Sequence, residues 1–159
     1  MTRSRTSDAG VTLVEVLVVL VLVGVLTSAV ALGVGSGGRG TGLEREGDLL
    51  ISRLNRMADE VALRGTSAAL VWGEDSYAFR VREGDDWVPH PVPALARTHR
   101  LPARTEIRVG DAARGSLVVT QDLLLSSGER ARLVLGSGGA ARQMILFDGI
   151  TARRSDDAS

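Results

Sequence analysis

Cysteine and lysine are both absent from this 159-residue sequence. Without cysteine the chain can form no disulfide and no thiolate zinc site, and it has no thiol nucleophile. Aromatic residues are also scarce, with two Trp, one Tyr and two Phe, and four of the five fall between Trp72 and Trp87. The core must therefore consist mainly of Leu and Val, with one aromatic cluster near the middle of the chain.

The net charge excludes a strong general attraction to polyanions. All 19 cations are arginines, and they are balanced by 19 acidic residues. A balanced charge gives no bulk electrostatic attraction to nucleic acid or to anionic lipid. The arginines form no basic run along the sequence. Nucleic acid is therefore not predicted as a partner, and no cofactor is predicted either.

The N-terminal part contains a long segment without charge. Residues 16–38 hold no charged side chain, and as a helix they would span about 34 Å, enough for the apolar core of a bilayer. The run is too long for one strand, and in lipid a helix satisfies its own backbone. Arg3 and Arg5 precede it, which places the N-terminus in the cytoplasm. The expected division is a leader over 1–10, a transmembrane helix over 11–38 and an exported domain over 39–159.

An ordinary secretory signal is the competing interpretation of this segment. Ser28-Ala29-Val30-Ala31 offers an A-x-A cleavage site behind an apolar stretch. Glu15 argues against it, because a carboxylate costs up to ~3 kcal/mol at the bilayer centre and less at the interface. A carboxylate at the membrane edge is usually retained for a partner.

A motif at the start of the apolar run carries a family resemblance. Gly10-Val11-Thr12-Leu13-Val14-Glu15 resembles the class III signal of type IV pilins and type II secretion pseudopilins. The resemblance implies that a prepilin peptidase cuts between Gly10 and Val11, that Val11 is then methylated, and that Glu15 stays in the mature helix. The family usually has Phe where this chain has Val11. Physically, the new amine and the Glu15 carboxylate would offset each other's desolvation if they paired between neighbouring subunits.

The exported domain begins with a helix pattern. Residues 33–42 hold six glycines and predict a flexible hinge just outside the membrane. Leu50, Leu54, Met57 and Val61 then recur at helical spacing and form one apolar stripe. We expect an amphipathic helix over 43–64 that ends at Gly65 as its C-cap.

After Gly65 the pattern changes to the alternation of strands. In residues 76–82, Tyr77, Phe79 and Val81 share one face while Arg80 and Arg82 share the other. The proline-rich stretch 89–102 is expected to be an edge or loop. The expected strands are 68–72, 76–82, an extended piece over 85–92, and 105–109, 115–120, 130–135 and 143–147. The fold class is therefore α+β and pilin-like, with a long N-terminal helix packed on an antiparallel β domain over 66–152.

Several short motifs narrow the resemblance. The chain is similar to the minor pseudopilin H family of type II secretion through Ala62-Leu63-Arg64-Gly65, Tyr77-x-Phe79, Trp87-x-Pro89, Leu101-Pro102 and Ser127-Gly128-Glu129. The resemblance implies a non-enzymatic subunit near the tip of a short periplasmic pseudopilus that drives protein export across the outer membrane. Its partners would be the major pseudopilin G, the minor pseudopilins I, J and K, the prepilin peptidase and the inner-membrane secretion platform. It would cross the inner membrane once, with its C-terminal domain in the periplasm.

Other function classes have weaker support. His90 and His99 lack metal-ligand spacing and are expected to be surface loop residues, and the pairs Asp85-Asp86 and Asp156-Asp157 are expected to be solvated. No G-x-S-x-G or H-E-x-x-H motif occurs, so an anchored hydrolase is a poor second hypothesis. The closer alternative is a minor type IV pilin active in pilus assembly or DNA uptake. Only Arg153-Arg154 favours DNA binding, and the two aspartates that follow cancel that charge.

Overall fold

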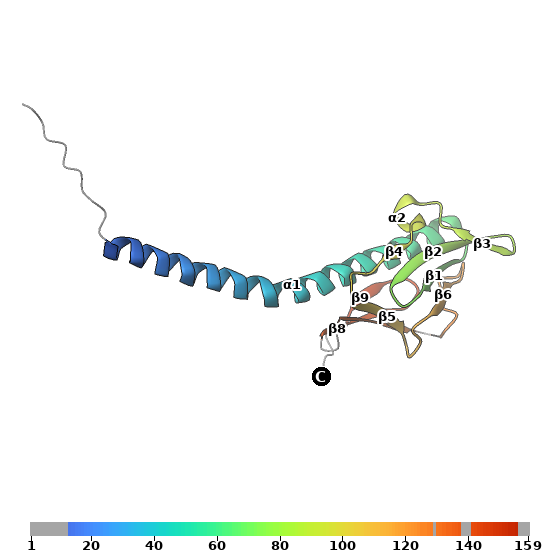
Figure 1. The fold of residues 1–159 in the computed structure, drawn as a ribbon. Coiled ribbons are helices and arrows are strands. Elements are labelled where there is room, and N and C mark those ends of the chain that lie inside the picture. Colours follow the sequence, from blue (N-terminus) through green and yellow to red (C-terminus); the bar gives the residue numbers. More distant parts are fainter. Residues whose placement is uncertain (1–12, 129, 138–140, 156–159) are drawn as a thin grey trace, which may run out of the picture. The chain divides into compact units, whose positions relative to one another are not determined.

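The computed structural model describes residues 13–128, 130–137 and 141–155 (Figure 1). The chain divides after Gly38 into two compact units, residues 1–38 and 39–159. One helix, α1 (Leu13–Arg64), runs across this division. It is followed by β1 (Ala68–Trp72), β2 (Ser76–Glu83), β3 (Asp86–Pro89), α2 (Pro93–Ala96), β4 (His99–Arg100), β5 (Thr105–Val109), β6 (Gly115–Val119), β7 (Ala131–Ser137), β8 (Ala141–Phe147) and β9 (Ala152–Arg154).

The C-terminal half of α1 confirms the predicted amphipathic helix. Leu50, Leu54, Met57 and Val61 are at most 1% exposed and form its core-facing stripe. The helix ends at Arg64, and Gly65 follows in a left-handed conformation (φ 61°) with its N–H donating to the carbonyl of Val61 at 2.8 Å. The glycine-rich segment 33–42 is helical and does not interrupt α1. Glycine costs about 1 kcal/mol relative to alanine in a helix but does not forbid it.

Two antiparallel sheets form the β domain. The first has the order β3-β2-β1-β6, with β4 also pairing with β2, and the second has the order β5-β7-β8-β9. Tyr77, Phe79 and Val81 are buried on the inner face of β2, as the alternation predicts. The inner faces of both sheets and the stripe of α1 enclose one hydrophobic core. The α+β architecture is therefore confirmed.

The predicted strands agree with the structure except around the prolines and at the C-terminal end. Strands 68–72 and 105–109 have the predicted bounds, and four others are shifted by a few residues. The extended piece expected over 85–92 was wrong in extent, because strand β3 stops at Pro89 and Pro93 starts the short helix α2. Strand β9 was not predicted, since its short Ala-Arg-Arg sequence carries no apolar alternation.

Polar side chains of α1 hold the C-terminal strands. Asn55 binds both backbone groups of Ala152 in β9: its Oδ1 accepts from the N–H at 2.6 Å and its Nδ2 donates to the carbonyl at 3.3 Å. Arg154 donates to Asp48 at 2.6 Å. Because β9 is an edge strand, the carboxamide of Asn55 makes the two backbone hydrogen bonds that a neighbouring strand would otherwise make with Ala152.

A glycine in α1 allows one of these contacts. A Cβ added at Gly47 would overlap the carboxamide of Gln143. That carboxamide is buried, and in the orientation that satisfies its neighbours it donates to the carbonyl of Leu43 at 2.8 Å and accepts from Nε of Arg154 at 3.0 Å. Gln143 can therefore move away only by losing these hydrogen bonds.

The effect of Gly47→Ala on the free energy of unfolding is expected to be opposite in sign when residue 143 is glutamine and when it is alanine. In the wild-type background the overlap with Gln143 should lower the free energy of unfolding by about 1–2 kcal/mol. In the Gln143→Ala background the overlap is absent, and the helix propensity of alanine should raise the free energy of unfolding by up to about 1 kcal/mol. Urea denaturation of the four chains measures this coupling. Equal effects in both backgrounds would contradict the contact.

Candidate functional site

The predicted N-terminal site is partly described by the structure. The predicted cleavage and methylation positions, Gly10 and Val11, lie outside the described residues. Glu15 is the third residue of α1 and is exposed. Its carboxylate lies in the first turn, where the positive end of the helix dipole favours a negative charge.

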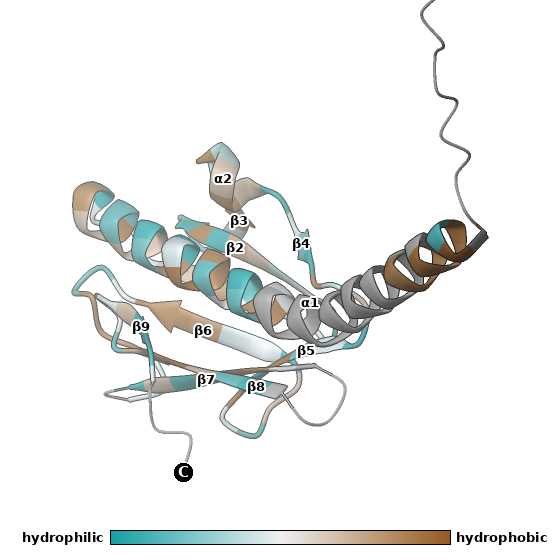
Figure 2. Cartoon of the chain, turned by 90° about the vertical axis from the view of Figure 1, so that its left-hand side faces the viewer, coloured by the Kyte–Doolittle hydropathy of each residue, from teal (hydrophilic) through white to brown (hydrophobic). Residues whose placement is uncertain are grey.

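An apolar surface surrounds Glu15. The described side chains there are 48–68% exposed, and they are Val14, Val16, Leu17, Val18, Leu20, Val21 and Leu22. Because successive helix residues are about 100° apart, these seven side chains cover about two thirds of the circumference, and Glu15 lies in the remaining sector. Figure 2 shows the first turns of α1 as predominantly hydrophobic. A helix surface that is broadly apolar and exposed requires apolar neighbours, and a carboxylate within it is stabilised by a polar or charged group.

Over the residues that the structure describes, none of the helices combines the length and the apolarity that crossing a membrane requires.

The expectation that His90 is a surface loop residue was wrong. His90 is 1% exposed, its backbone N–H donates to the carbonyl of Phe79 at 3.2 Å, and its Nδ1 accepts from the N–H of Val92 at 3.2 Å. Burial lowers the pKa of His90, although the nearby Glu60 carboxylate opposes that shift. Glu60 is itself buried and pairs with Arg56 and Arg64 at 2.9 and 2.7 Å. His90 is a structural residue that orders the start of the proline-rich segment.

The lowered pKa of His90 predicts a pH-dependent stability. Below the ordinary histidine pKa the unfolded chain binds a proton that the folded chain resists, so stability should fall as the pH falls from about 6.5 toward the lower pKa of the folded state. The slope cannot exceed about 1.4 kcal/mol per pH unit for one proton. Urea denaturation at pH 7 and pH 5 should therefore show a larger loss for the wild type than for His90→Gln. A wild type and a variant with equal losses would contradict this account.

His99 also lies in a structured environment and not in a free surface loop. Its Nε2 lies 2.7 Å from Oε2 of Glu46 on α1, and both side chains are mostly buried. The His99 ring packs against the ring of Tyr77 with centroids 5.0 Å apart. Burial raises the pKa of Tyr77 to about 12, and its hydroxyl accepts from Arg53 at 3.3 Å. This cluster joins α1 to β2 and β4.

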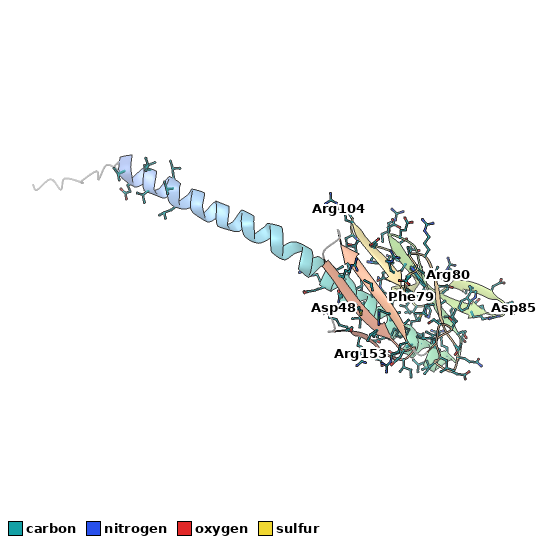
Figure 3. All side chains as sticks on the ribbon, turned by 90° about the horizontal axis from the view of Figure 1, so that it is seen from below. Asp48, Phe79, Arg80, Asp85, Arg104 and Arg153 are labelled. Carbon is teal, nitrogen blue, oxygen red and sulfur yellow. The ribbon has the colours of Figure 1, made fainter. Side chains whose placement is uncertain are left out.

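Arg153 and Arg154 lie on opposite faces of β9. Arg154 points toward α1 and pairs with Asp48, whereas Arg153 lies on the outer face of the second sheet (Figure 3 labels Asp48 and Arg153). Adjacent residues of a strand point to opposite faces, so the two cannot form one basic patch.

The carboxylate pair Asp85-Asp86 is exposed where the turn after β2 meets the start of β3, and Arg82 contacts Asp85 at 3.3 Å. Asp156-Asp157 lies outside the described residues. Within the described part of the chain, no group of three or more His, Cys, Asp or Glu side chains could hold a metal ion.

Comparisons with known proteins fit this geometry. Residues 5–31 match the family described as the prokaryotic N-terminal methylation motif, a range that includes Gly10, Val11 and Glu15. No curated protein matches the sequence.

Two solved structures are similar in fold, and both are crystal structures of the type IV minor pilin FimU of Pseudomonas aeruginosa (strain PAO1). The crystal form in space group P21 gives a TM-score of 0.54 at 13% identity, covering 71% of this chain and 87% of FimU. The form in space group P65 gives 0.50 at 12% identity, covering 72% and 90%. At this identity the likeness concerns the fold. The chain thus has a pilin-like fold and carries, over residues 5–31, the prokaryotic N-terminal methylation motif.

Proposed function

We propose that this chain is a minor subunit of a pilin-type filament, and that the filament is the periplasmic pseudopilus of a type II secretion system. The observation that carries the proposal is the apolar first segment of α1, which bears the carboxylate of Glu15 within the methylation motif. A monomeric soluble protein rarely exposes an apolar surface as broad as the one on this helix. A subunit that packs this helix among the helices of its neighbours would cover that surface.

Processing comes first in the proposed sequence of events. The prepilin peptidase cuts between Gly10 and Val11, residues 11–38 hold the product in the inner membrane, and the domain over 39–159 lies in the periplasm. The new amine of Val11 has an ordinary pKa near 8 and carries a positive charge at neutral pH. Paired with Glu15 of a neighbouring subunit, it would set the axial register of that subunit in the filament.

Within this class we place the chain with minor pseudopilin H, near the tip and next to pseudopilins G, I, J and K. The motifs from Ala62-Leu63-Arg64-Gly65 to Ser127-Gly128-Glu129 support this assignment. We propose no enzymatic activity, because the function needs only the helix and the surfaces of the domain.

A minor type IV pilin is the second candidate. The fold similarity to FimU, a type IV minor pilin, favours it. The two candidates predict different losses on deletion of the gene. A pseudopilin is required for release of exported proteins into the medium, whereas a pilus subunit is required for surface pili.

The test is a deletion in the source bacterium, complemented with the wild-type gene. We expect secreted proteins to accumulate in the periplasm and surface pili to remain. Loss of pili with normal secretion would support the type IV minor pilin instead. Mass analysis of the purified protein provides a second test: an N-terminus at methylated Val11 is expected, and one at Leu32 would indicate an ordinary secreted protein.

A further inference from the structure

The outer face of the second sheet gathers arginines that are far apart in the sequence. Ile107, Leu133, Leu135, Ile145 and Phe147 are fully buried on its inner face. Alternation along the strands therefore turns one set of arginines outward, and all four are exposed: Arg108, Arg132, Arg142 and Arg153. We call this set the arginine face. On the outward side of β5, β7, β8 and β9, Glu106 is its single carboxylate.

The strand register places these groups close together. Leu146 pairs with both Arg132 and Arg153, so these two arginines lie two strands apart, about 10 Å. Val134 pairs with both Arg108 and Met144. The arginines thus surround a small apolar centre.

A depression of about 340 Å³ occupies this centre. Its lining includes Arg108, Arg132 and Arg142 together with the half-buried side chains of Val134 and Met144. Arg108 donates to the backbone carbonyl of Asp111 at 2.6 Å. In the part of the chain that the structure describes, Arg132, Arg142 and Arg153 form no ion pair, so their guanidinium groups are available to a ligand.

We infer that the arginine face is a docking surface for a protein partner that presents aspartate or glutamate side chains. Such side chains combine an apolar stem, which Val134 and Met144 can contact, with a carboxylate that a guanidinium binds through two parallel hydrogen bonds. The inference goes beyond the proposed function and does not rest on it, because it concerns the domain and not the N-terminal helix.

Two observations favour carboxylates over nucleic acid. Glu106 and Asp111 also line the depression and interrupt the continuous basic surface that a phosphate backbone requires. The outward residues of β5, β7, β8 and β9 include no aromatic side chain on which bases could stack.

The test uses the full-length chain in an uncharged detergent and measures fluorescence anisotropy of labelled probes. The first probe is a capped peptide of alternating glutamate and alanine with six negative charges. The second is a thymidine oligonucleotide with six phosphodiester groups. Wild type is compared with Arg132→Gln/Arg142→Gln. The matched control is Arg97→Gln/Arg100→Gln, which removes the same charge at exposed positions outside the face.

We expect the wild type to bind the peptide more tightly than the oligonucleotide. Loss of charge-assisted hydrogen bonds in Arg132→Gln/Arg142→Gln should weaken peptide binding at least about tenfold. The control should bind within about twofold of wild type, because distant exposed charges are screened by salt. The inference is overturned by absence of peptide binding, by equal losses in both double variants, or by tighter binding of the oligonucleotide through the same arginines. The last result would assign the face to nucleic acid.

Discussion

Glu15→Leu is expected to leave the protein in the membrane but to exclude it from the filament. The substitution removes the only charge between Asp8 and Arg39, so membrane insertion should be as good as in wild type or better. The amine of Val11 in the neighbouring subunit would then be buried without its partner. Breaking a buried pair in this way costs about 3–5 kcal/mol, which is a loss of more than a hundredfold in incorporation.

The measurement is the fraction of the subunit that sediments with filaments released from the periplasm, compared with the fraction left in the membrane. Val18→Leu is the matched control, since it changes an exposed apolar residue one turn further along the helix and keeps the carboxylate. It should be incorporated like wild type. Recovery of Glu15→Leu in filaments at the wild-type level would refute the role of Glu15. This result would not bear on the inference about the arginine face.

Asn55→Ala should have the largest effect on the stability of the domain. Ala152 is 3% exposed, so removal of the carboxamide leaves its N–H and its carbonyl buried without their partner. Each such group costs about 1–3 kcal/mol, and we expect the free energy of unfolding to fall by about 2–4 kcal/mol in total. Asn55→Asp keeps the acceptor and loses the donor, so its free energy of unfolding should lie between those of the alanine variant and the wild type.

Asp59→Ala controls for the change in helix propensity. Asp59 is exposed on the same helix, and asparagine and aspartate have similar propensities, so its replacement should change stability little. Urea denaturation followed by the fluorescence of Trp72 and Trp87 measures all four chains. If Asn55→Ala and Asp59→Ala had the same stability, the contact with Ala152 would be energetically irrelevant.

The sequence was sufficient for features set by short-range patterns. The stripe from Leu50 to Val61 has one period throughout and gave the helix, and the alternation in residues 76–82 gave β2 with its inner face. Gly65 stopped the helix as predicted, because a left-handed residue is most easily supplied by glycine. These features depend on residues within a few positions of one another.

Features set by distant residues could not be predicted in the same way. His90 resembles a loop residue among prolines, and only its packing near Glu60 makes it a buried group. The arginine face was missed for a related reason: Arg108 and Arg142 are well separated in sequence, and no local charge count detects what strand pairing brings together. At the N-terminal site the sequence identified Glu15, and the structure adds the exposed apolar surface around it. The assignments of Gly10, Val11 and Glu15 stay predictions.

The bonds from Asn55 to Ala152 also determine when the domain can finish folding. The helix that carries Asn55 is synthesised 97 residues before its partner, and Asp48 precedes Arg154 by 106 residues. At about 5–20 residues per second, α1 therefore waits on the order of 5–20 s for the strand that completes its polar contacts. Chains that end before Ala152 lack these contacts and expose the open edge of β8. The domain can therefore reach its final fold only after β9 has been synthesised.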